Sequence, residues 1–128
     1  APACTALYPA DPRERARARQ LQAWLRSDLA ALRQERQTES VFYGDAGQPL
    51  SDDGHAAASK LIHVAGALIG AGQTSLFDDW CIADLDLAVA LRRLWQDGLP
   101  EPLRDYVEAQ WRRPSVRQWL EHNAQARA

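Results

Sequence analysis

Apolar side chains recur every three or four residues over most of the chain, which is the spacing of one face of an α-helix. The pattern first predicts a helix over residues 12–36, with Arg and Gln between the apolar positions. Asp11 is a favourable N-cap, and Pro12 suits the first helical position, where its missing N–H is no loss. The apolar positions of this predicted helix are Leu21, Trp24, Leu25, Leu29 and Leu32.

Four further helices follow from the same pattern. Ser51 caps a second helix, and residues 82–96 form a third helix that is apolar on nearly every side. A helix of that kind belongs at the centre of a fold. Gly98 and Pro100 break the chain before a fourth helix, and Pro114 starts a short fifth one.

The remaining segments carry turn formers or lack periodicity. Residues 38–50 are predicted to be a loop, residues 1–10 a linker remnant and residues 123–128 a frayed tail. Strand-like alternation never exceeds a few residues. The prediction is therefore an all-α domain over residues 11–122, a five-helix bundle with a buried central helix.

Composition supports one folded domain and narrows the function classes. The chain has 128 residues, of which 46% are hydrophobic and 25% charged, as is usual for a globular domain with a single core. Its formal net charge is -2, and residues 38–86 hold one Lys against eight acids. A basic surface that would neutralise phosphates is missing from this sequence, which argues against nucleic acid as a partner. No apolar run approaches the roughly 18 residues of a membrane helix.

Cysteine and methionine usage adds two expectations. Cys4 and Cys81 are too few for a disulfide framework, and with no signal peptide in the sequence this favours a cytoplasmic protein. The chain starts at Ala1 and contains no Met, so we expect a processed form or a piece of a larger protein.

The start of the central helix carries acids. With Cys81 as N-cap, Asp84 is the third helical residue, where its carboxylate reaches back to the Cys81 N–H as one half of a capping box. The thiol is a poor acceptor for the other half, so Asp84 should satisfy most of the open donors. Trp80 and Leu85 occupy the positions of a hydrophobic staple. Asp86 is expected to face outward and to interact with the helix dipole.

Other side chains invite a chemical interpretation, but each has a plainer one. A helix N-terminus favours a reactive Cys81 thiolate, whereas burial and four nearby Asp side chains oppose it, so an inert, packed thiol is preferred. The spacing of His55, His63 and His122 does not suit a metal site, and no metal is expected. The Arg-rich run over residues 13–19 alternates with Ala and Glu and is best explained as a solvated helix face.

Three strings carry a resemblance to a known family. They are LYPADPRERARARQLQAWL (residues 7–25), SLFDDWCIADLDLAVALRRL (residues 75–94) and QWRRPSVRQWL (residues 110–120). Together they resemble the C-terminal helical domain of a cytosolic glutathione transferase. In that family Ser/Thr-x-x-Asp starts the buried central helix, so Asp84 matches the pattern and Cys81 departs from it. The strings ARARQLQAWLRSDL and WCIAD further resemble a bacterial subgroup, the YfcF-like transferases, associated with glutathione conjugation and glutathione-dependent peroxide reduction.

The resemblance implies an enzyme whose chemistry lies outside these residues. In the family, glutathione and the residue that activates its thiol are held by an N-terminal thioredoxin-like domain, which no part of this sequence matches. The chain alone is therefore expected to be inactive. The complete protein would use glutathione as co-substrate and an electrophile or hydroperoxide as acceptor, and would be a homodimer.

The resemblance also implies which helices matter. The family's helical domain supplies one wall of the acceptor pocket and part of the subunit interface, mainly through its first two helices. On that analogy Ser27, Ala31 and Gln34, which share a face of the first predicted helix, are candidate acceptor contacts. Trp24, beside them, is a candidate for contact with a planar electrophile, although core packing is the plainer interpretation. The Arg-rich run has one alternative role, the steering of anionic glutathione.

A second function stays open at this point. The same helical domain is found in translation factors and other assembly proteins, where it binds partners. The alternative to an enzyme is therefore a non-catalytic interaction module with the same fold.

Overall fold

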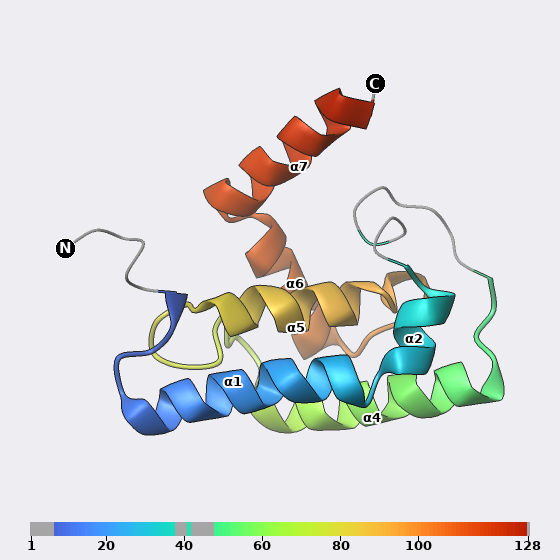
Figure 1. Ribbon diagram of the computed structural model, residues 1–128, viewed down its shortest axis with the longest axis horizontal. Coiled ribbons are helices and arrows are strands. Elements are labelled where there is room, and N and C mark those ends of the chain that lie inside the picture. Colours follow the sequence, from blue (N-terminus) through green and yellow to red (C-terminus); the bar gives the residue numbers. More distant parts are fainter. Residues whose placement is uncertain (1–6, 38–40, 42–47, 128) are drawn as a thin grey trace.

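The described part of the chain is helical. The computed structural model describes residues 7–37, 41 and 48–127, and for Trp119 and residues 123–127 it describes the backbone alone. Within those residues the regular elements are helices, α-helical with short 3-10 segments, and no strand is present (Figure 1). The elements are α1 Pro12–Ser27, α2 Ala30–Glu35, α4 Asp52–Leu68, α5 Ile82–Arg92, η2 Trp95–Asp97, α6 Glu101–Trp111 and α7 Pro114–Arg127. The predicted all-α class is confirmed.

Helix α5 is the central helix, as predicted. It contacts α1, α4 and α6, while α2 packs on α4 and α7 leaves the end of α6 to point away from the other helices (Figure 1). The buried side chains of α5 are Ala83, Asp84, Leu87, Ala88, Ala90 and Leu91. Five of these six are apolar, so the fully buried Asp84 is the exception that needs a physical account.

Local signals explain where the first and second predicted helices begin. The Asp11 carboxylate accepts the Glu14 N–H at 3.0 Å, and the Ser51 hydroxyl accepts the Gly54 N–H at 3.1 Å. Glu35, at the end of α2, accepts from both the N–H and the hydroxyl of Ser51. A Cβ on Gly54 would lie 2.7 Å from the Glu35 carboxylate, so glycine leaves room for that carboxylate at the start of α4.

The first predicted helix is wrong in one respect, because it is two helices. The chain leaves helical geometry at Leu29, whose φ is -114° and ψ 26°, and the Ser27 hydroxyl donates to the Asp28 carboxylate at 2.8 Å. Short polar side chains that bond locally compete with a continuous helix. The break also turns Leu29 and Leu32 inward, where both are buried, and brings α2 against α4.

Two other boundaries differ from the prediction. The central helix ends at Arg92 instead of residue 96, because its last turn tightens: Leu94 bonds back to Leu91, and Trp95–Asp97 forms a 3-10 helix. The segment expected to fray continues α7 to Arg127. Most of the predicted loop over residues 38–50 lies outside the described residues.

Candidate functional site

Asp84 closes the N-terminal end of α5. Its side chain is fully buried and accepts three hydrogen bonds: from the Cys81 N–H at 3.0 Å, the Leu76 N–H at 2.8 Å and the Tyr106 hydroxyl at 2.7 Å. The bond from Cys81 is the capping-box bond. The bonds from Leu76 and Tyr106 reach a preceding loop and α6, so one carboxylate joins three parts of the fold.

The electrostatics of this cluster favour a structural role. Burial raises the pKa of the Asp84 carboxyl, and the hydrogen bonds from Tyr106, Cys81 and Leu76 oppose that rise. Burial and the neighbouring Asp84 strongly raise the pKa of Tyr106, so the phenol keeps its proton and remains a donor. The cluster has no opening to solvent at its carboxylate, which suits a support for the helix rather than acid–base catalysis.

The Cys81 thiol is packed rather than reactive. Its exposed fraction is 1%, and burial raises its pKa, with the charges of Asp84 and Asp86 adding to the effect. The sulfur faces backbone N–H groups of the first turn, and the Asp84 N–H also bonds the Cys81 carbonyl oxygen at 3.0 Å. A thiol with a raised pKa is a poor nucleophile at neutral pH.

The two residues of the predicted staple have different surroundings. Trp80 donates its indole N–H to Gln110 at 2.8 Å, and the Arg113 guanidinium lies 4.3 Å from the Trp80 ring centroid. Leu85 instead lines a groove beside α1. The contacts of Trp80 are therefore with α6 and the residues that follow it.

Asp86 does not face outward, which corrects the prediction. Its carboxylate accepts from the Gln22 side chain at 2.6 Å, and Gln22 in turn accepts from the Tyr8 hydroxyl at 2.9 Å. Gln22 is buried and Asp86 half-buried. Asp86 thus links α5 to α1, a partnership 64 residues apart in sequence that no local pattern reveals.

The four predicted acceptor contacts do not share a surface. Ser27 is exposed and bonded to Asp28, Ala31 packs on the core, and Gln34 is exposed on α2. The shared face assumed one continuous helix, and the break after Ser27 removes it. Trp24 is the exception, because it lines a cavity.

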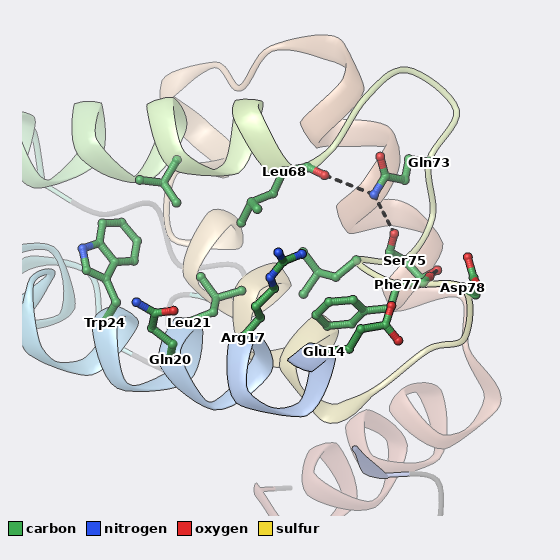
Figure 2. A pocket seen from close by; sticks show the side chains of 12 residues that line it. Glu14, Arg17, Gln20, Leu21, Trp24, Leu68, Gln73, Ser75, Phe77 and Asp78 are labelled. Carbon is green, nitrogen blue, oxygen red and sulfur yellow. Dashed lines mark hydrogen bonds between the residues drawn. The ribbon is translucent and has the colours of Figure 1, made fainter. Parts of the chain in front are cut away.

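That cavity lies between α1 and α4 and has a volume of about 700 Å³ (Figure 2). Trp24 and Leu21 of α1 project toward Leu68 of α4, and a loop that includes Phe77 closes one side. Gln73 fixes this loop by donating to the carbonyl oxygens of Leu68 and Ser75, as the dashed lines show. Glu14, Arg17, Gln20 and Asp78 add polar groups around an otherwise apolar hollow. Leu68 has an exposed fraction of 42%, which is high for a leucine.

A smaller groove, of about 300 Å³, runs along a different face of α1, where α1, α2 and α5 meet. Gln22 and Asp86, bonded to each other, also line it. Its apolar lining is Leu25, Leu29, Leu32, Leu85, Val89 and Ala90. Three guanidinium groups stand around that lining, from Arg26 at the end of α1, Arg33 on α2 and Arg93 at the end of α5. The break between α1 and α2 is what brings these elements around one hollow.

Comparisons with known proteins show which family has this helical architecture. A family model described as "Glutathione S-transferase, C-terminal domain" matches residues 11–125. The chain belongs to this family. It is also similar to a crystal structure of a glutathione transferase homologue from Burkholderia, strain BGR1, with bound glutathione: 40% of residues are identical, the TM-score is 0.73, and 93% of this chain is covered. The match covers 56% of that neighbour, so the present chain spans little more than half its length. Among curated proteins, none matches the chain.

The C-terminal end of α5 in this transferase domain has a polar centre that the sequence did not suggest. Arg36, which is 4% exposed, donates to the carbonyl oxygens of Gln48 and Arg93 and pairs with the Asp97 carboxylate at 2.5 Å. Arg93 returns a hydrogen bond to the Arg36 carbonyl oxygen. The guanidinium therefore satisfies the Arg93 carbonyl oxygen, which the end of α5 leaves open, together with the Gln48 carbonyl oxygen of the segment before α4.

The remaining chemical candidates of this domain lie at its surface. Arg13, Arg17 and Arg19 are exposed, and the Arg19 guanidinium lies 5.0 Å from the Tyr8 ring centroid. The three histidines are exposed, and in the described part of the chain no three His, Cys, Asp or Glu side chains are grouped to hold a metal ion. None of the described helices has the length and apolar character needed to cross a membrane.

Proposed function

We propose that this chain is the helical half of a glutathione transferase of the YfcF-like subgroup, cytoplasmic and homodimeric when complete. The family match over residues 11–125 supports this, as does the 40% identity to a homologue crystallised with glutathione. In the complete protein the sequence beyond this chain holds glutathione and activates its thiol. We expect the chain alone to be inactive toward acceptors, because the groups proposed to hold glutathione and to activate its thiol lie beyond it.

The reactions proposed are conjugation and peroxide reduction. In conjugation the thiolate sulfur bonds to an electrophilic carbon and a leaving group such as chloride departs. In peroxide reduction two glutathione molecules are oxidised to their disulfide while a hydroperoxide becomes an alcohol and water. The helical domain shapes the site where the acceptor lies.

The groove between α1, α2 and α5 is the proposed acceptor wall. The groove includes residues from the second half of the first predicted helix, which is the segment that the family resemblance indicates. The residues of that segment that line the groove include Arg26, Leu29 and Arg33. Ser27, Ala31 and Gln34 do not line it. Guanidinium groups around an apolar lining also favour the thiolate form of a neighbouring thiol. This electrostatic setting is the observation that favours the groove over the α1–α4 cavity.

The α1–α4 cavity is the proposed subunit contact. It joins the first two long helices, and its apolar lining with the exposed Leu68 suits burial against another surface. On this assignment Trp24 packs at the contact. A planar electrophile bound against Trp24 is the competing role for the same cavity, and its volume suits a ligand of that size.

Glutathione consumption tests the proposal. The complete protein and this 128-residue chain are each given glutathione with chlorodinitrobenzene and, separately, with cumene hydroperoxide. We expect thiol loss with the complete protein and none above the uncatalysed rate with the chain alone. If the complete protein is inactive with both acceptors, the interaction module becomes the better explanation.

A further inference from the structure

The groove between α1, α2 and α5 is lined by more positively charged than negatively charged side chains. Arg26, Arg33 and Arg93 line it, and the one carboxylate on it is that of Asp86. The Asp86 carboxylate is already engaged by Gln22. The groove therefore presents three guanidinium groups to one carboxylate that has another partner.

The hydrogen bonds of these arginines leave most of their donors open. Arg26 donates to the Gln22 carbonyl oxygen at 3.3 Å, Arg33 to that of Arg26, and Arg93 to that of Arg36. None of the three forms an ion pair with an acid among the residues that the structure describes. A guanidinium has five N–H donors, so groups with one main-chain acceptor each still have donors for a ligand.

Keeping like charges together at an apolar hollow costs free energy. Burial lowers the pKa of Arg93, and the positive charge of the nearby Arg33 lowers it further. The charge of Arg36, by contrast, is compensated by its ion pair with Asp97. An anion in the groove would relieve the repulsion that the protein itself leaves uncompensated.

The shape of the groove limits which anion fits. Its lining of Leu, Val and Ala side chains takes an apolar body, and a volume of about 300 Å³ takes a small ring or a short chain. The planar fork of a guanidinium matches the two oxygens of a carboxylate. A bare inorganic ion would meet the arginines but leave the apolar lining uncovered.

We infer that the preferred acceptors of this transferase are small apolar molecules that carry a carboxylate, which Arg33 and Arg26 bind at the groove. This inference rests on the proposed function and names the substrate class of its acceptor site. Arg33 and Arg26 are exposed and come from two helices, so they reach a ligand without rearranging the core.

A matched pair of acceptors tests the inference with the complete protein. The pair is 4-(bromomethyl)benzoate and its methyl ester, which share the reacting carbon and differ in charge. In both, the glutathione sulfur bonds to the benzylic carbon, bromide leaves and the thiol proton goes to solvent. After subtraction of the uncatalysed rate, we expect kcat/KM for the acid to exceed that for the ester by about tenfold at low salt, as a charge-assisted hydrogen bond allows. Added salt should shrink the ratio.

Substitutions test which side chains cause the preference for the acid. Arg33→Gln should lower kcat/KM for the acid several-fold more than kcat/KM for the ester and so remove most of the preference for the acid, and Arg26→Gln should act in the same direction. Lys60→Gln is the matched control, because Lys60 is an exposed cation on α4 that does not line the groove. It should leave the ratio unchanged.

A binding measurement makes the result independent of catalysis. Isothermal titration of the complete protein with unreactive 4-methylbenzoate should give saturable binding that Arg33→Gln weakens and Lys60→Gln does not. Equal kcat/KM for acid and ester in the unmodified protein, or equal losses in Arg33→Gln and Lys60→Gln, would overturn the inference while leaving the transferase intact. Inactivity with the ester and with chlorodinitrobenzene would instead overturn the proposed function.

Discussion

The two ends of α5 solve opposite problems with opposite charges. At the N-terminal end open N–H groups need an acceptor, and the Asp84 carboxylate accepts from Cys81 and Leu76. At the C-terminal end open carbonyl groups need a donor, and Arg36 donates to the Arg93 carbonyl oxygen there and to that of Gln48 in a neighbouring segment. A buried helix terminus without such partners would cost free energy for each open group.

The ends differ in how their charge is compensated. Asp84 is fully buried and its bonded partners are two N–H groups and a hydroxyl, so burial raises its pKa. Arg36 is also buried, yet it pairs with Asp97, whose side chain is 31% exposed. The N-terminal centre is therefore sealed, while the C-terminal one keeps a route to water.

Each end also supports one of the two hollows on α1. Asp84 holds the N–H of Leu76, which lines the α1–α4 cavity. Arg36 and Arg93 exchange hydrogen bonds, and Arg93 lines the groove. Damage at one end should disturb one hollow more than the other.

Asp84→Ala should have the largest effect. It leaves three donors in a sealed site without an acceptor, and we expect a loss of about 3–5 kcal/mol in the free energy of unfolding. Urea denaturation measures this loss. An unchanged midpoint would show that the carboxylate does not support the helix end.

Arg36→Met should cost somewhat less, about 2–4 kcal/mol, because water reaches Asp97 when its partner is removed. Arg36→Lys is the control that keeps the positive charge but lacks the planar guanidinium, and it should recover part of the lost free energy of unfolding. A cost for Arg36→Met above that for Asp84→Ala would contradict the contrast between a sealed end and an open one.

The pH dependence of stability should differ between Asp84 and its neutral replacement Asn. The pKa of the Asp84 carboxyl is raised above its ordinary value of 3.8, so between that value and the folded pKa the native state binds more protons than the unfolded state. Stability therefore falls as pH rises through this window, by about 1.4 kcal/mol for each unit of raised pKa, and is level above it. The free energy of unfolding relative to Asp84→Asn, followed from pH 4 upward, should show that fall. A rise would mean a folded pKa below 3.8.

Cys81→Ser should have the smallest effect, within about 1 kcal/mol. The hydroxyl is a better cap acceptor than the thiol but needs an acceptor for its own proton in a buried site. Thermal unfolding compares the two proteins. A loss of several kcal/mol would show that the thiol packs as an apolar group that tolerates no hydroxyl.

Sequence reasoning succeeded where the partners are close in the chain. Asp11, Ser51 and Asp84 each bond a backbone N–H three residues away, and such caps leave a local pattern. The apolar periodicity of residues 82–96 likewise identified the central helix, because apolar residues on nearly every side of a helix indicate that it is buried.

It failed where distant segments decide the outcome. Arg36 and Asp97 lie 61 residues apart, and the break before α2 accompanies the burial of Leu29 and Leu32 and the packing of α2 on α4. With that break unseen, Ser27, Ala31 and Gln34 were assigned to one face of a continuous helix that the structure does not form, and their contact with an acceptor stays a prediction. The three arginines of the groove come from three helices, so no single stretch of sequence shows that they meet.

Matched truncations can separate the roles proposed for the two hollows, acceptor binding in the groove and subunit contact at the α1–α4 cavity. Leu85→Ala removes apolar lining from the groove, and Leu68→Ala removes it from the α1–α4 cavity. In the complete protein, KM for chlorodinitrobenzene and the subunit dissociation constant from sedimentation are measured for both variants. Leu85→Ala should raise KM several-fold and leave dissociation unchanged, while Leu68→Ala should weaken the dimer alone. A raised KM in Leu68→Ala with an intact dimer would show instead that the acceptor binds in the cavity beside Trp24.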